Sequence, residues 1–368
     1  MLKAYKYRLY PTRNQKTLFA KTFGCVRFVY NRMLADRKQN YEENKGLDVK
    51  DIKYPTPAQY KPEFPWLKEV DSLALANAQL NLNKAYSSFF RRLKKHDEEV
   101  GFPKFKSRRN NNYSYTTNNQ GETIRLEGNK IKLPKIGFVR LKLHRNYKGL
   151  VKSTTVSQTP SGKYFISILV NTENVPLKPV TNKIGIDLGI KKFAVLSTGE
   201  IIENPKYLRK SEVKLAEKQK SLSRKSKGSN NRRKARIQVA KLHEKITNQK
   251  NDFLHKLTCR LLRENQVIVI EDLGVKNMME NSYFAKSIAE VSWAEFRRQL
   301  EYKAKWFGRE VIIAPRDYAS SQLCSGCGNQ SDQTKDLGCR MYKCEICGLE
   351  IDRDYNASLN LLTLSPQI

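Results

Sequence analysis

Apolar and polar residues alternate in the first half of the chain, and this alternation predicts strands. Residues 2–10 alternate, with Tyr5, Tyr7 and Leu9 on one face and Lys6 and Arg8 on the other, and similar runs return in residues 122–143 and 150–171. Turn pairs such as Gly128-Asn129 separate these runs. Several short strands at this spacing are typical of a small antiparallel barrel, which the first strand would complete.

Apolar residues at helical spacing predict two long helices between the first strand and this barrel. One follows Pro11, takes Thr12 as its N-cap and continues to about residue 40. The other covers about residues 72–98 and has a predicted buried face of Leu73, Ala76, Leu80, Ala85 and Phe89. Residues 45–66 contain four prolines and are predicted to be mostly loop. A helical insertion after one strand is the simplest account of this arrangement.

A second set of strands begins at residue 183. The stretch KIGIDLGIKKFAVLSTGEII predicts three strands, the first of which carries Asp187. QVIVIEDL predicts a buried strand that ends at Glu271, and REVIIAP predicts another strand. Residues 208–264 have the pattern of a charged helical hairpin broken near Gly228, and residues 292–308 that of an amphipathic helix. The polar residues 276–287 are predicted to be a loop.

The net charge of +33 is concentrated in one part of the chain. Residues 1–250 carry 54 Lys and Arg against 20 Asp and Glu, whereas residues 251–368 carry 15 against 16. A positive field of this size most often binds nucleic acid. Membrane-surface binding is the rival interpretation, but the chain has no helix with a continuous apolar face and no lipidation motif. No signal-peptide core is present either, so we expect a cytoplasmic, nucleoid-associated protein of a prokaryote.

Two segments have too few acids to balance their basic residues. Residues 101–150 hold twelve Lys and Arg against two Glu, and residues 201–250 hold 16 against four. A plain structural barrel and a merely solvated helix are the alternatives to nucleic-acid binding. The imbalance favours contact with phosphates. The candidate nucleic-acid-binding residues are Lys104, Lys106, Arg232, Arg233, Lys234 and Arg236.

Two C-x-x-C pairs near the C-terminus form the clearest metal motif. Cys324 and Cys327 are separated by sixteen residues from Cys344 and Cys347, which is the spacing of a structural four-cysteine zinc site. A disulfide pair or four unrelated thiols is the alternative, although nothing else in the chain indicates secretion. Cys339, in the intervening loop, is a potential substitute ligand. Cys25 and Cys259 fall in apolar helical patterns and are expected to be packed rather than reactive.

Three carboxylates lie at the ends of predicted elements: Asp187, Glu271 and Asp354. A carboxylate in an apolar strand is costly unless it binds something, and Gly185 and Gly189 would leave room for a ligand or phosphate beside Asp187. An aspartate that merely caps a turn is the alternative. The motif DRD also offers Asp352 as a rival to Asp354.

Such hard oxygen ligands suit Mg²⁺ or Mn²⁺. Two ions about 4 Å apart can activate a water and stabilise the leaving 3′-oxygen in phosphodiester cleavage, without a side-chain nucleophile. The four histidines do not indicate a competing mechanism, and the chain has neither a P-loop nor a serine elbow.

These motifs together resemble the TnpB family, the transposon-encoded RNA-guided endonucleases related to Cas12 nucleases. The resemblance rests on GIDLGIKKFAV, VIVIEDL, SWAEFRRQLEYKAKWFG and the stretch from SSQLCSGCG to DRDYNASLN, and on YKYRLYPTRNQ, FVYNRML and GFPKFKSRR near the N-terminus. It therefore covers nearly the whole chain. It implies an α/β RNase H-like (RuvC) nuclease domain with an inserted zinc finger, and a wedge-type antiparallel barrel with a helical insertion.

The resemblance also implies a division into domains. The wedge barrel would comprise residues 1–10 and 101–182, the helical recognition domain 11–100, the RuvC-like domain 183–320 and 351–368, and the zinc finger 321–350. Asp187, Glu271 and Asp354 match the catalytic, Mg²⁺-binding carboxylates, the family pattern favouring the second acid of DRD. Cys324, Cys327, Cys344 and Cys347 match the zinc ligands.

The function implied is RNA-guided cleavage of double-stranded DNA beside a short target-adjacent motif. The guide RNA would come from the transposon end, and the protein is expected to be a monomer in the complex. Two alternatives share the fold. One is a guide-RNA-directed DNA-binding repressor that does not cleave. Such a protein would not need the three acids Asp187, Glu271 and Asp354, all of which are present in this chain. The other is a DNA-only RuvC-like nuclease or transposase, which would need less basic surface than this chain carries.

Overall fold

The computed structural model describes residues 1–43, 54–96, 100–110, 113–274, 278, 280, 282–336 and 338–366. The chain divides into two compact units, Met1–Glu173 and Asn174–Ile368. Predicted loop residues 45–53, 276–277, 279 and 281 lie outside the described residues, as do residues 97 and 98 of the second predicted helix. None of the described helices is long and apolar enough to cross a membrane.

The first unit is built on a seven-stranded antiparallel sheet. Its strands, in spatial order, are β2 (Tyr113–Asn118), β6 (Leu150–Gln158), β7 (Tyr164–Asn171), β1 (Leu2–Tyr10), β5 (Gly137–Lys142), β4 (Lys130–Leu133) and β3 (Arg125–Glu127). The predicted first strand therefore lies in the middle of the sheet. Because β2 and β3 are edge strands, the sheet is an open, curled half-barrel rather than the closed barrel that the spacing predicts. The sequence pattern had not indicated β2.

Two helices cover the inner face of this sheet: α1 (Arg13–Glu43) and α2 (Ser72–Lys94). The predicted cap at Thr12 is confirmed as a reciprocal capping box. The Gln15 amide donates to Thr12 Oγ1 at 3.3 Å, and the Thr12 amide donates to Gln15 Oε1 at 3.0 Å. Short 3₁₀ turns, η1 (Pro65–Glu69) and η2 (Arg108–Asn110), follow in the connections.

The predicted buried face of α2 is wrong. Ala74, Leu75, Ala78 and Leu82 are buried, whereas Leu80 is 48% exposed. Residues 73–82 have apolar side chains at nearly every second position, so two stripes offset around the helix both satisfy helical spacing. Packing against α1 and the sheet, which periodicity does not report, selects the second stripe.

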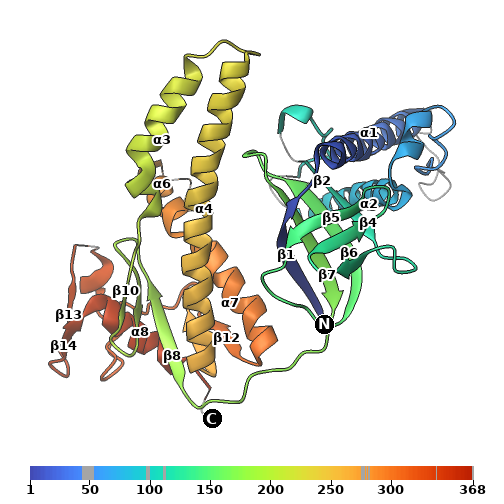
Figure 1. The fold of residues 1–368 in the computed structure, drawn as a ribbon. Helices are drawn as coiled ribbons and strands as arrows, with labels where there is room; N and C mark the ends of the chain where they lie inside the picture. Colours follow the sequence, from blue (N-terminus) through green and yellow to red (C-terminus); the bar gives the residue numbers. More distant parts are fainter. Residues whose placement is uncertain are drawn as a thin grey trace. The chain divides into compact units, whose positions relative to one another are not determined.

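The second unit contains a five-stranded mixed sheet (Figure 1). Its order is β10 (Ile201–Glu203), β9 (Lys192–Leu196), β8 (Lys183–Leu188), β11 (Val267–Ile270) and β12 (Glu310–Ile313). Strands β8, β11 and β12 run parallel to one another. Strand β9 runs antiparallel to β8, and β10 runs antiparallel to β9. All of these strands lie within the predicted segments except β10, which extends one residue further, to Glu203.

Helices cover both faces of this sheet because its central strands are apolar on both sides. Ile184 and Ile186 of β8 pack with α4 (Asn230–Glu264) and α7 (Trp293–Phe307). Val267 and Val269 of β11 pack on the other side, with Leu361 of α8 (Arg353–Thr363). This second layer positions the C-terminal acid.

The predicted charged hairpin is confirmed as α3 (Tyr207–Ser223) and α4, which lie side by side in Figure 1. Ser229 caps α4 by accepting a hydrogen bond from the Arg232 amide. The prediction of a loop through residue 287 is wrong, because α6 (Ser282–Val291) is helical from residue 282. The segment was predicted to be a loop from its polar residues alone, and an amphipathic helix also contains such residues on its exposed face.

Candidate functional site

Asp187 and Glu271 lie side by side at the carboxyl ends of two parallel strands. Ile186 of β8 pairs with Ile270 of β11, so the next residue of each strand is one of the two acids. The Leu188 amide donates to Glu271 Oε1 at 3.1 Å, which fixes the glutamate against β8. Carboxyl ends of parallel strands are a common ligand-binding edge of α/β sheets.

Asp354 reaches this edge because α8 packs very closely on β8. A Cβ atom at Gly185 would lie 2.1 Å from the Ser358 carbonyl oxygen and 2.7 Å from the Leu362 amide nitrogen. The expectation that Gly185 leaves room for a ligand is therefore wrong, since the backbone of α8 fills that space. A Cβ at Gly189 would likewise lie 2.8 Å from the Lys192 carbonyl oxygen, within the tight turn.

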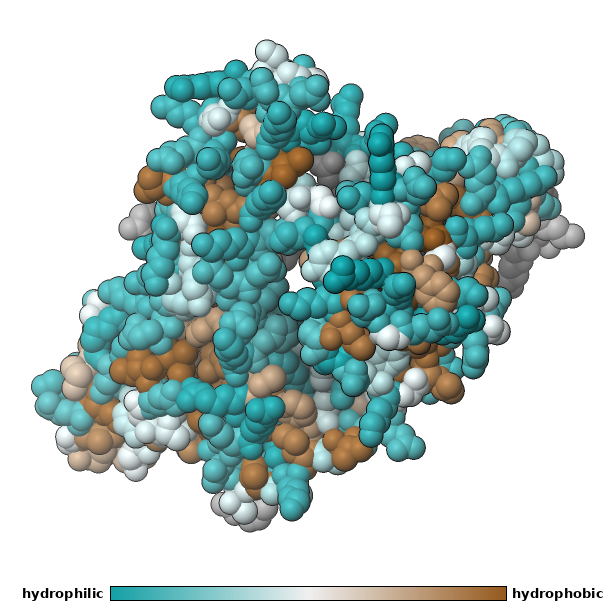
Figure 2. Space-filling model, viewed as in Figure 1, coloured by the Kyte–Doolittle hydropathy of each residue, from teal (hydrophilic) through white to brown (hydrophobic). Residues whose placement is uncertain are grey.

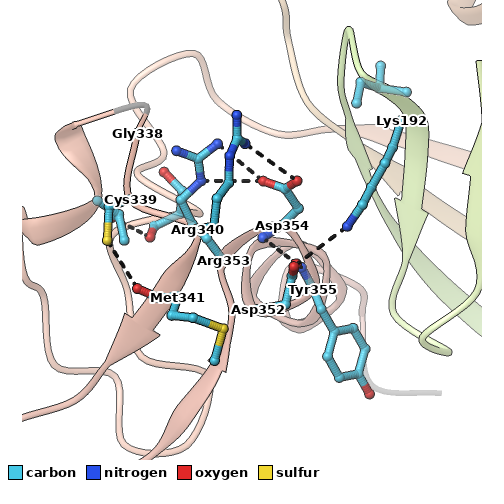
Figure 3. Close-up of polar contacts among 12 residues, drawn as sticks. Lys192, Gly338, Cys339, Arg340, Met341, Asp352, Arg353, Asp354 and Tyr355 are labelled. Carbon is cyan, nitrogen blue, oxygen red and sulfur yellow. Dashed lines mark hydrogen bonds and ion pairs between the residues drawn. The ribbon is translucent and has the colours of Figure 1, made fainter.

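The two acids of the DRD motif have different surroundings (Figure 3). Asp352 ends β14 (Glu350–Asp352) and caps α8, its Oδ1 accepting hydrogen bonds from the Asp354 and Tyr355 amides at 3.0 Å each. Its Oδ2 lies 3.6 Å from Lys192 Nζ. Asp354 contacts two arginines instead: Arg353 Nη2 lies 3.2 Å from its Oδ1, and Arg340 Nη1 4.0 Å from its Oδ2. The geometry therefore favours Asp354 for the acid set and gives Asp352 a capping role.

The electrostatics of the three acids fit a cation site. Burial and the neighbouring Glu271 carboxylate raise the pKa of Asp187 well above its ordinary value, with a smaller contribution from Asp354. The nearby Arg353 acts in the opposite direction. Carboxylates that disfavour one another's charge in this way, and that offer only hard oxygen donors, suit a divalent ion of the Mg²⁺ type.

The acids line an open cleft of about 740 Å³. Basic side chains stand around the same cleft: Lys191, Lys192, Lys206, Arg209, Arg340 and Arg353. Acids at the centre and cations at the rim can bind a phosphodiester while ions neutralise the acids.

The four predicted cysteine ligands come together. Their Sγ atoms all lie within 4.8 Å of one another, with Cys324 3.5 Å from Cys347 and Cys327 3.5 Å from Cys344. Zinc–sulfur bonds of about 2.3 Å give tetrahedral sulfur–sulfur edges of roughly 3.8 Å, so the cluster fits a structural zinc ion. The Cys347 and Ile346 amides lower the pKa of Cys344 to about 6, whereas hydrogen bonds with neighbouring thiols raise the pKa of Cys327 and of Cys347. Cys344 is therefore the ligand most readily present as the thiolate that zinc binds.

The cysteine finger is attached directly to the helix that carries Asp354. Asn356 of α8 donates to the Leu323 carbonyl oxygen at 2.6 Å and accepts from the Ser325 amide at 2.9 Å. Asn360 donates to the carbonyl oxygens of Ser320 and Leu323. The strand pair β13 (Met341–Lys343) and β14 then leads into α8. The finger therefore holds α8 at two places. One is the β13–β14 hairpin that precedes the helix, and the other is the set of hydrogen bonds to Leu323, next to the first cysteine pair.

Cys339 is not a substitute ligand. It lies outside the four-sulfur cluster, and its Sγ donates to the Met341 carbonyl oxygen at 3.1 Å. Cys25 is buried, as predicted, and Cys259 is half-buried.

The predicted nucleic-acid-binding residues differ in whether their side chains already contact other groups of the protein. Arg232 Nη1 donates to the carbonyl oxygens of Leu222 and Lys225, so it ties the α3–α4 hairpin together. Lys106 Nζ lies 4.0 Å from the centroid of the Tyr30 ring. The exposed candidates are Lys104, Lys106, Arg233, Lys234 and Arg236. Figure 2 shows hydrophilic residues over most of the visible length of the hairpin.

The sequence analysis missed a basic face on the outside of the first sheet. The outward-facing cations of β1, β5, β4 and β3 form a surface that we call the basic sheet face. Its members are Lys6, Arg8, Arg125, Lys130, Lys132, Arg140 and Lys142. Three pairs of them are direct cross-strand partners, namely Arg8 with Lys142, Lys130 with Arg140, and Arg125 with Lys132. Glu127 lies on the same face and pairs with Arg125 at 2.7 Å. Like charges opposite one another destabilise a sheet, so the excess of cations favours an anionic partner. The alternating Lys and Arg were visible in the sequence, but only the register shows that they oppose one another.

Known proteins share this fold, and relatives align over almost the whole of this sequence. A Cas12f1 protein in a complex with sgRNA and target DNA superimposes with a TM-score of 0.55 over 98% of both chains, at 15% identity, which shows the fold alone. The molecule therefore has a mixed α/β, Cas12f-like fold with a four-cysteine cluster. Sequence models match at residues 166–282 (OrfB of IS605, probable transposase), 1–46 (helix-turn-helix domain) and 293–361 (Cas12f1-like TNB domain). Residues 1–43 in fact form one strand and one helix.

Two relatives extend over almost the entire chain. A Streptomyces pristinaespiralis protein named "Putative RNA-guided DNA endonuclease" is 38% identical over 98% of this chain and 88% of its own length. The protein of the same description from Escherichia coli K12, InsQ, is 35% identical over 98% of this chain and 92% of its own. The chain therefore belongs to the OrfB/TnpB family of IS605-type transposons.

Proposed function

We propose that the protein is a transposon-encoded, RNA-guided DNA endonuclease that cuts target DNA next to a short target-adjacent motif. The observation that carries the proposal is the arrangement of Asp187, Glu271 and Asp354 in one cleft of a chain that belongs to this family. The relatives' names supply the nucleic acids, and the acids supply a means of hydrolysis.

The proposed cofactor of the acid site is Mg²⁺, as two ions, with Mn²⁺ as a substitute. When bound, these ions activate the attacking water and stabilise the leaving 3′-oxygen. Asp187 and Glu271 hold them at the strand edge, and Asp354 closes the site from α8. Arg340 and Arg353, now against Asp354, are placed to bind non-bridging phosphate oxygens. Zinc at the finger keeps α8 in place and takes no part in the reaction.

We assign the mixed sheet and its helices to an RNase H-like (RuvC) nuclease domain, residues 183–320 and 351–368, with the finger at 321–350. The half-barrel corresponds to the wedge domain, residues 1–10 and 101–182, and α1 and α2 to a recognition insertion, residues 11–100. The support is the order of elements and the likeness of the whole chain to the Cas12f1 fold.

The proposed partners are a guide RNA from the transposon end and double-stranded target DNA. The basic sheet face and the α3–α4 hairpin offer phosphate-binding surfaces with far fewer acids than bases, although Glu127 pairs with Arg125 on the sheet face. The basic sheet face presents cations in a regular array, which suits the backbone of a folded RNA better than base readout.

The first experiment is to express the protein with its native downstream flanking DNA and purify it without nuclease treatment. Any RNA that co-elutes is then sequenced. We expect one structured RNA that ends in a variable segment, and cutting of a DNA matched to that segment in Mg²⁺. Only heterogeneous RNA that salt removes, together with cutting that survives RNase treatment during purification, would instead support the DNA-only nuclease.

Asp187→Ala provides the control for the acid site. Cutting should be abolished while RNA and target binding stay nearly unchanged, because Asp187 lies in the cleft and not on the basic surfaces. Preserved cutting by this variant would contradict the role assigned to the acids. Bound target without any cutting by the unmodified protein would support the repressor.

A further inference from the structure

A third parallel strand ends beside the two that carry the acids. β12 pairs with β11 up to Ile313, and the Ala314 amide donates to the Ile270 carbonyl oxygen at 2.8 Å. The chain then turns at Pro315, where the Tyr318 amide donates to the Pro315 carbonyl oxygen. This turn presents Arg316 at the same strand edge as Glu271.

A recess of about 240 Å³ lies between the ends of β11 and β12. Its lining combines apolar groups with the polar groups of Glu271, Asp272 and Arg316. The apolar part comprises Leu273, Gly274, Ala314, Pro315, Tyr318 and Leu361. Glu271 also lines the large acid cleft, so the recess adjoins that cleft across a single side chain. Apolar walls with a few convergent polar groups are typical of sites for small organic groups such as a base or sugar.

The guanidinium of Arg316 is available to an anion. Its side chain is 68% exposed, and Nη2 lies 3.5 Å from Asp272 Oδ2. Asp272 is already bound more closely by Arg297, whose Nη1 lies 2.6 Å from Oδ1. Asp272 is thus shared by two arginines and holds Arg316 only at the longer distance, while Arg297 also pairs with Glu301 at 2.9 Å. An exposed ion pair of this length contributes little stability, so a phosphate can replace it at small cost.

The wall opposite the arginine is held rigidly. The Tyr318 hydroxyl donates to the Asn360 carbonyl oxygen at 2.9 Å, which ties the recess to α8. Among the described residues, a Cβ at Gly274 would approach only the Arg316 Cζ, at 4.0 Å, so the Gly274 backbone lies beside the guanidinium. The recess is therefore preorganised, with an apolar wall on one side and a charged group at its rim.

We propose that this recess is a nucleotide subsite for the DNA strand being cut. It holds the nucleotide next to the scissile phosphate, with Arg316 on the phosphate that flanks the cut. The proposal rests on the proposed nuclease function, since it takes the scissile phosphate to lie at Glu271 in the acid cleft. A strand passing from that cleft across Glu271 enters the recess directly.

A neutral-backbone scan combined with Arg316→Ala tests this subsite. Single methylphosphonates replace, one at a time, the phosphates around the mapped cut site in a single-stranded target. Affinity is measured for the RNA-loaded protein in the Asp187→Ala background, so that no cutting intervenes. Arg298→Ala is the matched control, because Arg298 is 62% exposed, is paired with Glu295 and lines neither cavity.

We expect Arg316→Ala to weaken binding of the unmodified strand by about 10-fold. At one phosphate adjacent to the cut, the methylphosphonate should weaken binding with Arg316 present and have no further effect in Arg316→Ala. Arg298→Ala should leave the whole scan unchanged. Asp272 keeps its bond to Arg297 in the variant, so thermal unfolding should show an intact fold.

Independent effects at every position would overturn the subsite, as would coupling at a phosphate distant from the cut. Cutting by the protein with Asp187 intact is measured in parallel on the unmodified strand. If that protein cuts and no coupling appears, the subsite alone is wrong. If it does not cut, the nuclease function is wrong, and the assignment of the recess to a cut strand falls with it.

Discussion

The two sheets of this protein carry their charge in opposite ways. The antiparallel sheet spreads seven cations over the outer face of β1, β5, β4 and β3, whereas β2, β6 and β7 of the same sheet present mainly hydroxyls on that face. The mixed sheet instead gathers its acids at one edge, where two strands and one helix bring single side chains together. A polyanion can be held by many interchangeable charges, but hydrolysis needs a few fixed ones.

The difference follows from two properties of strands. Alternation along a strand points every second residue to one face, so a repeated Lys or Arg covers an area. The end of a parallel strand points to an edge, so a single acid there lies next to the acid on its neighbour. We therefore expect substitutions at the edge to have large effects singly, and substitutions on the basic sheet face to have moderate effects only in combination.

The largest expected effect separates the two acids of the DRD motif. Asp354→Ala should lower single-turnover DNA cleavage by ~1000-fold or more, because it removes an acid of the cleft. Asp352→Asn should keep cleavage within about 5-fold, because asparagine is an equally good N-cap for α8. Comparable losses in both variants would show that Asp352 also binds metal or substrate.

The acid site could be predicted from the sequence because its residues sit at element ends that periodicity locates well. Asp187 and Glu271 interrupt or follow apolar runs, and the structure brings both to the expected edge. Which acid of DRD joins them depended on where α8 begins, which the structure places at Arg353 and which an apolar pattern locates only to within a residue or two. The family resemblance, and not the periodicity, favoured Asp354.

Other features depended on contacts that one sequence does not contain. The choice between the two apolar stripes of α2 is made by α1 and the sheet, and the space beside Gly185 is filled by α8, 173 residues later at Ser358. The like-charge pairs of the basic sheet face appear only when the register is known. In each case the local pattern allowed several arrangements and tertiary packing selected one.

The finger should have the next largest effect, because it supports the edge from outside the cleft. Cys344→Ser removes one of four zinc ligands and, with it, the brace on α8. We expect loss of bound zinc, measured by metal analysis, and a fall in cleavage of roughly 10- to 100-fold. Cys339→Ser, outside the cluster, is the control and should retain zinc. Full activity of a zinc-free variant would contradict the bracing role.

Three substitutions test whether the basic sheet face binds RNA through many interchangeable cations. Lys130→Ala, Arg140→Ala and Lys142→Ala combined should weaken guide-RNA binding by roughly 10-fold and reduce the salt dependence of log Kd by about 2 to 3. Stability should not fall, because the change relieves two like-charge pairs. The control combines Ser114→Ala, Ser157→Ala and Ser167→Ala on the hydroxyl half. Equal loss of affinity in both triple variants would contradict a basic RNA track.

The smallest expected effect concerns the stability of the magnesium-free protein. The folded pKa of Asp187 is raised by burial and by Glu271, so its favourable contribution to folding is complete below the unfolded pKa of about 3.9. That contribution is lost as pH rises through the folded value, and at pH 7 the carboxylate destabilises the fold. Asp187→Asn stays neutral and should raise Tm at pH 7 by ~2–4 °C in magnesium-free buffer.

The gain should shrink as pH is lowered towards 4, where Asp187 itself becomes protonated, and it should reverse in saturating Mg²⁺, which stabilises only the protein that binds it. Chelators are left out so that the finger retains its zinc. Asp317→Asn, at an exposed acid outside both cavities, is the control and should leave Tm unchanged. A lower Tm for Asp187→Asn without magnesium would mean that the carboxylate is needed for folding. The clustered acids would then stabilise the edge, and the contrast between an edge of fixed acids, proposed to be catalytic, and a basic face that tolerates substitution would not hold.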